Sequence, residues 1–211
     1  GEEVNNHIEN TYNAQEKFKD AMQYHNKIIE MKDASGQFPK DYLKLGLSNY
    51  NRINNDEALK YYLKLGSRYP QSAEADEAMD NMRNIDVELG RPNEYVDFVK
   101  KSGKVISISE ADSLTFASAE LKYNNSDCVG AITSLSNYLS QYPQGAYILE
   151  ANFYRSECYA KNKDWQNTVQ GYGTVVNLGS NKYAERSALA AARTYYFELQ
   201  DYAKAKIYFT K

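Results

Sequence analysis

A small-residue pattern recurs along the whole chain at an almost constant spacing, and it constrains the fold more than any other feature. Each copy follows an acidic or polar turn, and the five successive intervals are 37, 37, 36, 37 and 37 residues. The aligned residues are Ala21, Ala58, Tyr95, Ala131, Thr168 and Ala205. The near copies "RYPQSAEA" (68–75) and "QYPQGAYI" (141–148) lie two repeats apart. A fixed period of this length predicts a stack of repeated structural units.

Each repeat contains two helical patterns joined by a short polar turn. In "PKDYLKLGLSNYNRI" the apolar residues fall on one side of a helix, and "DEALKYYLKLGSRY" gives a second helix of the same kind. The "NND" between them predicts a turn and an N-cap. Pro39 fits a first helical turn, whereas Pro70 and Pro143 fall just past helix ends. "KVISIS" (104–109) alternates only briefly, and we interpret it as a loop that runs into a helix.

This helix–turn–helix pattern resembles the tetratricopeptide repeat (TPR) family. That family places an aromatic residue, Leu-Gly and a Tyr in the first helix, and a small residue, an aromatic residue and a final Pro around the second. The second repeat matches in order at Tyr42, Leu45, Gly46, Ala58, Tyr62 and Pro70. Later repeats keep a small pair that lets two helices approach closely, Ala119 with Ala131 and Ser156 with Thr168. The third repeat departs from the family, with Arg83 and Tyr95 at these positions.

The resemblance implies an all-α fold, a right-handed superhelical solenoid of antiparallel helix pairs with about five repeats and a partial sixth. The expected repeats of this single TPR-like domain are about 2–38, 39–75, 76–111, 112–148, 149–185 and, partial, 186–211. The sixth ends with Ile207, Tyr208 and Phe209, although solenoids usually finish with a polar capping helix. We therefore expect the natural chain to continue, and this end to self-associate when cut.

The stretch from Tyr138 to Val176 is also similar to TPR proteins of Gram-negative cell envelopes, of the outer-membrane-assembly and Tol–Pal types. The shared features are a Tyr-Pro, a small residue, an Ala, a run of aromatics and an Asp-aromatic pair. This resemblance implies a periplasmic or membrane-anchored adaptor such as a lipoprotein, so we expect the cell envelope rather than the cytoplasm. No apolar run approaches the roughly 18 residues that a spanning helix needs, so we expect no membrane contact within this sequence.

The residues that usually carry chemistry are sparse and scattered. His7 and His25 are the two histidines, and Cys128 and Cys158 are not in a metal-binding spacing, so we expect no metal site and two reduced thiols. Phosphate loops, nucleophile elbows and zinc-protease motifs are absent. The net charge of −3 does not favour nucleic acid as a partner. The sequence therefore predicts neither an enzyme nor a cofactor.

The function that remains is binding of a partner by shape. We expect a protein or peptide segment to bind the concave face, which first helices line in this family. The expected binding residues are Tyr50, Asn51, Asn84, Phe116, Glu120, Tyr123, Asn124, Phe153, Glu157, Lys161 and Phe197. Glu120 and Glu157 would form one strip and hold a basic or aromatic segment. The alternatives are a carbohydrate- or cell-wall-binding module, since Tyr and Asn also suit sugars, and a purely structural segment of a longer solenoid.

Overall fold

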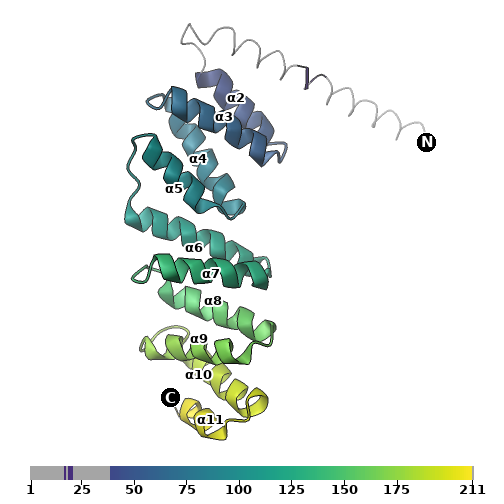
Figure 1. Ribbon diagram of the computed structural model, residues 1–211, viewed down its shortest axis with the longest axis vertical. Helices are drawn as coiled ribbons and strands as arrows, with labels where there is room; N and C mark the ends of the chain where they lie inside the picture. The colour runs from purple at the N-terminus through teal and green to yellow at the C-terminus, as the bar shows by residue number, and fades with distance from the viewer. Residues whose placement is uncertain (1–16, 18, 21–38, 211) are drawn as a thin grey trace, which may run out of the picture. The chain divides into compact units, whose positions relative to one another are not determined.

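The computed structural model describes residues 17, 19–20 and 39–210 of the 211-residue chain (Figure 1). The described residues form α-helices and one π-helical segment, and none of them forms a strand. The all-α fold that the repeats predict is therefore confirmed. The expected first repeat, about 2–38, with Ala21 and both histidines, lies almost entirely outside the described residues.

The helices follow one another in pairs along the chain (Figure 1). Their bounds are α2 (Pro39–Tyr50), α3 (Asn55–Arg68), α4 (Ala73–Glu88), α5 (Pro92–Lys101), α6 (Ile108–Asn124), α7 (Cys128–Gln141), α8 (Ile148–Lys161), α9 (Trp165–Asn177), α10 (Ala184–Arg193), the π-helix η2 (Thr194–Glu198) and α11 (Tyr202–Phe209). Pro39 begins α2, and Pro70 and Pro143 follow the ends of α3 and α7, as expected. "KVISIS" runs into α6, whose N-cap Ser107 accepts the Glu110 N–H.

The chain divides into two compact units between Ile85 and Asp86, inside α4. In the N-terminal unit α2 packs against α3. In the C-terminal unit α6 packs on α7, α7 on α8, α8 on α9, α9 on α10, and α10 on α11. Each helix of the C-terminal unit from α6 onward therefore contacts its sequence neighbours, which is the stacking that a repeat protein requires.

The recurring position, which holds a small residue in all described repeats except the third, has the same structural place in all five of them. It is the fourth residue of the second helix, and its exposed fraction is 9% or less in each of the five cases. The residues are Ala58, Tyr95, Ala131, Thr168 and Ala205. The helix pairs approach closely around this level. A Cβ added to Gly46 would lie 2.1 Å from the Tyr62 ring, and one added to Gly171 would lie 2.0 Å from Ser156 Oγ. The repeat in the sequence therefore marks the places where the two helices of a pair approach closely.

The turn inside each repeat also has a fixed backbone geometry. The residue before each N-cap has a positive φ, between 54° and 75°. These residues are Ile53, Gly90, Ser126, Lys163 and Gln200, at the same 37, 36, 37 and 37 spacing. In the first four turns the N-cap N–H donates to the carbonyl five residues earlier, as from Asp164 to Tyr159 at 2.9 Å. The positive φ is therefore common to the turns of all five described repeats, and the closing hydrogen bond to the first four of them.

The π-helix absorbs an extra residue in the sixth repeat. Ala192 matches Ser156 after 36 residues, but Ala205 matches Thr168 after 37. The turn-closing bond accordingly reaches six residues back, from Asp201 N–H to the Tyr195 carbonyl at 2.9 Å. A π-helical turn is the usual way for a helix to hold one inserted residue. The insertion therefore widens the end of the helix, while Gln200 before the N-cap keeps its positive φ.

Cys128 and Cys158 form a disulfide between α7 and α8, so the prediction of two reduced thiols is wrong. Their Cα atoms are 5.0 Å apart, within the range a disulfide can bridge. Both residues belong to the apolar core that α6, α7 and α8 share. The 30-residue separation resembles no motif, because stacking of one repeat on the next, rather than local sequence, brings the two residues together.

Candidate interaction surface

Side chains from three successive first helices meet on one side of the C-terminal unit. Tyr123 lies on α6, Glu157 on α8 and Arg186 on α10. The Tyr123 hydroxyl donates a hydrogen bond to Glu157 Oε2, and Arg186 Nη2 donates to Glu157 Oε1 in an ion pair. Both oxygens of one carboxylate are therefore used, and the contact joins the fourth, fifth and sixth repeats. We call these three residues, with Glu120, Tyr154 and Lys161, the first-helix strip.

The cations of the strip lie outermost. The Arg186 side chain is 67% exposed, whereas its Glu157 partner is 15% exposed. The same order holds beside the strip, where Lys182 is exposed and pairs at 2.8 Å with the more buried Glu150. Lys161 is exposed, and its Nζ lies 5.8 Å from the centre of the Tyr123 ring. A ligand that approaches this surface therefore meets positive charge before it meets the carboxylates.

Stacked aromatic rings support the strip from below. Phe116 stacks on Tyr147 with ring centres 4.4 Å apart, and Phe153 stacks on Tyr183 at 4.2 Å. The two pairs are repeat equivalents, because Phe116 and Phe153 lie three residues before Ala119 and Ser156. Tyr147 and Tyr183 are the N-cap residues of α8 and α10. The first helices α8 and α10 are thus each anchored to the preceding first helix by a tyrosine at their start.

The hydroxyls of the strip remain protonated far above neutral pH. Burial, together with the hydrogen bond to Glu157, raises the pKa of Tyr123 to about 12. Burial also raises the pKa of Tyr154, whose ring stacks on Tyr123 at 4.3 Å, and hydrogen bonds to Tyr183 and Glu120 act in the same direction. Both phenols are therefore hydrogen-bond donors that position their neighbours, and neither is a base at physiological pH.

The structure brings together four of the residues expected at the site, Glu120, Tyr123, Glu157 and Lys161. Phe116 and Phe153 do not line the surface: they are 4% and 1% exposed, and the tyrosines that begin the next repeats cover them. The remaining expected residues are separate from the strip or belong to another unit. They are Asn124 at the exposed end of α6, Phe197 on η2, and Tyr50, Asn51 and Asn84 in the N-terminal unit.

Sequence reasoning missed three residues that organise the strip, Tyr154, Tyr183 and Arg186. A signal for one of them was present, because Tyr183 follows Tyr147 by 36 residues, the same interval that separates Ser156 from Ala192. No signal marked Arg186, whose equivalent in the fourth repeat is Ser113. The groove positions carried over from the family included the cation Lys161 but not Arg186.

Other kinds of site are not evident in the described part of the chain. No group of three or more His, Cys, Asp or Glu side chains there is arranged to hold a metal ion. None of the described helices combines the length and apolar character that crossing a membrane requires. The strip therefore offers charge, hydrogen-bond donors and aromatic rings, which are the components of a binding surface.

Comparison with known proteins gives a family for one part of the chain. Residues 42–72, which cover most of α2 and all of α3, match the tetratricopeptide repeat model. No curated protein sequence matches the chain. Two crystal structures of MamA are similar at 14% identity, with TM-scores of 0.41 and 0.42. They cover 82% and 79% of this chain and 88% and 91% of their own.

A Podosopora anserina protein of kinesin light chain type, with nearly identical TPR-like repeats, is similar at 13% identity with a TM-score of 0.40. That likeness covers 82% of this chain and 93% of the other. The TM-scores are below 0.5, and nothing about function follows from these likenesses. The family model and the structures do not support the resemblance to outer-membrane-assembly or Tol–Pal proteins. The chain carries a tetratricopeptide repeat at residues 42–72, in the pair α2 and α3.

Proposed function

We propose that this chain is a non-catalytic scaffold that binds a segment of a partner protein along the first-helix strip. TPR-like folds generally mediate protein–protein interaction. In the solenoid that the sequence predicts, the first helices line the concave face. The observation that carries the proposal is the shared contact of Tyr123, Glu157 and Arg186, because it fixes polar groups from three repeats on one surface.

The cations of the strip are more exposed than its carboxylates, and this arrangement favours an acidic partner segment. The Glu157 carboxylate already accepts hydrogen bonds from Tyr123 and Arg186, so a partner's arginine would have to displace Arg186. Arg186, Lys161 and Lys182 are exposed and can each pair with a carboxylate from outside. Arg186 also lies 5.0 Å from the Phe153 ring, which restricts its side chain. We therefore replace the basic segment expected from the sequence with an acidic one.

A random peptide library tests this function. Peptides that bind the whole chain would be selected and then tested for binding to a variant with Lys161→Ala, Lys182→Ala and Arg186→Ala. We expect the selected peptides to be rich in Asp and Glu and to lose most of their binding to the variant. A Lys60→Ala variant is the control, since Lys60 is an exposed lysine on α3 in the N-terminal unit. Peptides that bind all proteins equally would show that the strip is not the site.

A second part of the proposal concerns location. The Cys128–Cys158 disulfide supports an oxidising compartment, and we propose the cell envelope, or periplasm, rather than the cytoplasm. Alkylation of unfolded protein from native cells, followed by mass spectrometry, tests this. Detection of the Cys128 and Cys158 peptides linked by a disulfide and free of alkylation would support the proposal. Detection of both cysteines in alkylated form would contradict it.

Carbohydrate binding is a second candidate, and one observation favours it. Phe197 and Tyr202 are 67% and 59% exposed, and Tyr196 packs edge-on against both rings, with centres 4.9 and 5.1 Å away. Exposed aromatic faces suit the apolar faces of sugar rings. Gels that contain a polysaccharide test this candidate. Retarded migration of wild type that is lost in the Phe197→Ala variant would favour carbohydrate binding, whereas unchanged migration of wild type in every gel would exclude it.

A further inference from the structure

Two ion pairs hold exposed cations over α8. Lys182, in the loop before α10, pairs with Glu150 at 2.8 Å. Arg186, on α10, pairs with Glu157. The side chains of the two cations are 62% and 67% exposed, whereas those of the carboxylates that hold them are 18% and 15% exposed. Positive charge is therefore fixed at two places along α8, a helix that has described repeats before and after it.

A third cation follows on the same side of α8. The two carboxylates are seven residues apart, and Lys161 follows Glu157 by four residues. These separations correspond to rises of about 10.5 Å and about 6 Å, and the three levels lie within about 40° around the helix. Lys161 is exposed, with its Nζ 5.8 Å from the centre of the Tyr123 ring. We call these three cations, Lys182, Arg186 and Lys161, the cation row.

A helical partner can match the cation row with one of its faces. Carboxylates at positions i, i+7 and i+11 of an α-helix are separated by about 10.5 Å and about 6 Å along the axis and share one side. An extended segment rises about 3.3 Å per residue, so the same distances correspond to positions i, i+3 and i+5. Successive residues of an extended segment point to opposite sides, and the first of these three carboxylates would point away from the row.

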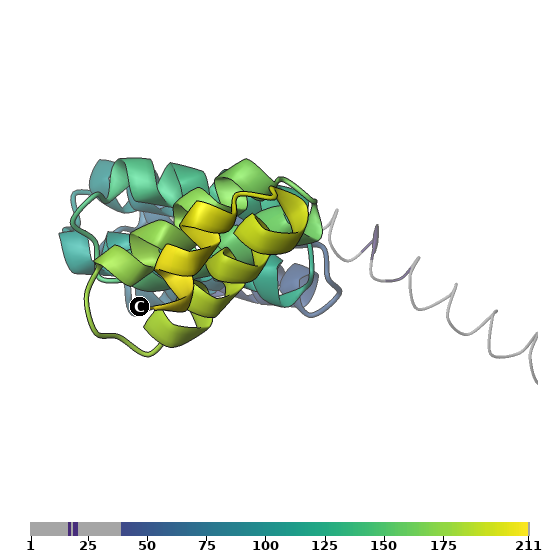
Figure 2. The same ribbon diagram turned by 90° about the horizontal axis from the view of Figure 1, so that it is seen from below.

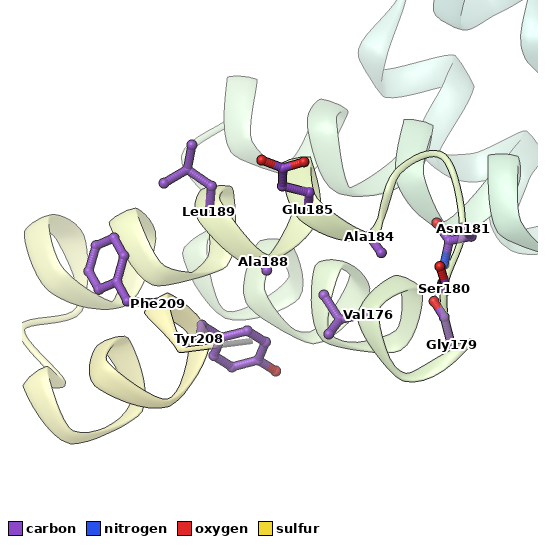
Figure 3. A pocket seen from close by; sticks show the side chains of 10 residues that line it. All are labelled: Val176, Gly179, Ser180, Asn181, Ala184, Glu185, Ala188, Leu189, Tyr208 and Phe209. Atoms are coloured by element: carbon purple, nitrogen blue, oxygen red, sulfur yellow. Dashed lines mark hydrogen bonds between the residues drawn. The ribbon is translucent and has the colours of Figure 1, made fainter.

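The pocket at the α10–α11 end of the C-terminal unit does not offer a comparable site. Figure 2 views the chain from this end, with α11 in front. The pocket has a volume of about 730 Å³, and the residues that line it include one charged side chain, Glu185, and no lysine or arginine (Figure 3). An acidic segment would therefore meet a carboxylate there and no cation.

We propose that the cation row binds an α-helix of a partner protein that carries three carboxylates on one face, spaced seven and four residues apart. This inference rests on the proposed function and adds the conformation of the partner and the spacing of its acidic residues. Glu150 and Glu157 already hold two of the three cations in place, so little side-chain freedom is lost when the helix binds. The partner's carboxylates accept from N–H groups that these cations still have, because a lysine has three donors and an arginine five.

The peptides selected against the whole chain test this inference through the spacing of their acidic residues. We expect Asp or Glu pairs separated by seven and by four residues to be enriched over the unselected library. Enrichment at separations of three and two residues, or at no preferred separation, would overturn the helix and leave an acidic partner intact. Absence of any enrichment in Asp and Glu would overturn the proposed function as well.

A selected peptide with the expected spacing tests the conformation. Proline placed midway between the two carboxylates that are seven residues apart should weaken binding to the whole chain by about tenfold or more, because proline breaks the interior of a helix. Proline at the first helical position of the same peptide is the matched control, since no helical hydrogen bond is lost there. Fluorescence anisotropy compares the two peptides, and equal affinities would overturn the proposal.

Charge exchange tests which cation each carboxylate meets. Lys182→Glu should weaken binding of the selected peptide by about tenfold, because it places like charges opposite each other. A lysine at the peptide carboxylate that is seven residues from the central one should restore binding, and a lysine at the other terminal carboxylate should not. Lys60→Glu on α3 is the control and should leave the affinity unchanged.

Circular dichroism should show that the Lys182→Glu and Lys60→Glu variants remain folded, since both side chains are mostly exposed. Equal restoration by a lysine at either terminal carboxylate would show that the cation row does not set the position of the helix, and would overturn the proposal. Loss of binding to the Lys60→Glu variant would overturn it too, because that residue lies in the N-terminal unit.

Discussion

Tyr123 on α6 and Glu157 on α8 are joined by a hydrogen bond that crosses from one repeat to the next. The donor is 34 residues before the acceptor. The same separation joins Ser113 to Tyr147 and Ala146 to Asp112. Three contacts at one separation show that α8 and its leading loop are fixed on α6 at both ends.

Tyr123→Phe should lower the free energy of unfolding by about 1–2 kcal/mol, because it removes a donor to a carboxylate that is mostly buried. The effect should also depend on pH. The folded chain holds the Tyr123 proton to about pH 12, above the ordinary pKa of 10.0, so the contribution of Tyr123 to stability is constant below about pH 10 and falls between the two values. Urea midpoints at pH 8 and 11 check this. The urea midpoint of the Tyr123→Phe variant should fall less between pH 8 and pH 11 than that of wild type. An equal fall in both proteins would contradict the role given to the Tyr123 hydroxyl.

Reduction of the Cys128–Cys158 disulfide should destabilise the C-terminal unit by about 3 kcal/mol. The bond closes a loop with a sequence separation of 30, which restricts the unfolded chain more than the folded one. Thermal unfolding of wild type with and without reductant measures the effect. Cys128→Ala with Cys158→Ala is the control, since its midpoint should not respond to reductant. A response of equal size in the double variant would show that the reductant acts elsewhere.

Ala58→Asp should cost about 3 kcal/mol, because it places an unpaired carboxylate at a fully buried helix contact in the N-terminal unit. Ala203→Asp is the matched control, because Ala203 is exposed on α11 and has little to lose. Urea unfolding followed by circular dichroism compares the two variants. Equal midpoints would show that the recurring small residue does not mark a close contact.

The residue spacing was sufficient to predict the helix pairs, because a small residue at a close helix contact is constrained wherever that contact recurs. Ala58, Ala131, Thr168 and Ala205 each have that position in the structure. The spacing also indicates the inserted residue that the π-helix accommodates. The interval between the small residues of the two helices grows from 12 residues in the fifth repeat to 13 in the sixth. An insertion of one residue can lengthen a turn or widen a helix, and the sequence does not distinguish the two.

The binding surface was less predictable. A helical period shows which residues share one side of a helix, but it does not show which other segments cover that side. Phe116 and Glu120 are four residues apart on α6, yet Tyr147 covers Phe116 and leaves Glu120 partly exposed. That covering residue comes from a loop, where no periodic pattern applies. The disulfide has the same cause, since it depends on how α7 and α8 stack.

Asp86→Asn should stabilise the chain at neutral pH and have little effect at pH 4. Asp86 is 2% exposed, and burial raises its pKa from the ordinary 3.8 to about 6, with Glu94 adding to the rise and Arg91 opposing it. The folded pKa is above the unfolded one, so the contribution of Asp86 is fully present below about pH 4 and is lost as the pH rises through 6. The gain from Asn at pH 7 should be about 1–3 kcal/mol.

Urea midpoints of both proteins at pH 4 and pH 8 check the prediction for Asp86. Wild type should show the greater loss on going to pH 8. Asp97→Asn on α5 is the control, because Asp97 is exposed and should not alter the difference between the two pH values. If the Asn variant shows the same pH dependence as wild type, another group carries it.

Ile53→Gly should raise the free energy of unfolding by about 0.5–1 kcal/mol. Ile53 has a φ of 60° before the N-cap of α3, a conformation that costs a β-branched residue about 1–2 kcal/mol and costs glycine almost nothing. The side chain is 87% exposed, so little apolar burial is lost. The chain itself has glycine at the equivalent position of the third repeat, Gly90, with a φ of 75°. Asn51→Gly in the same turn should instead destabilise, because Asn51 does not have a positive φ. Thermal midpoints of the two variants separate relief of backbone strain from a general effect of glycine, and a lower midpoint for Ile53→Gly would contradict the argument.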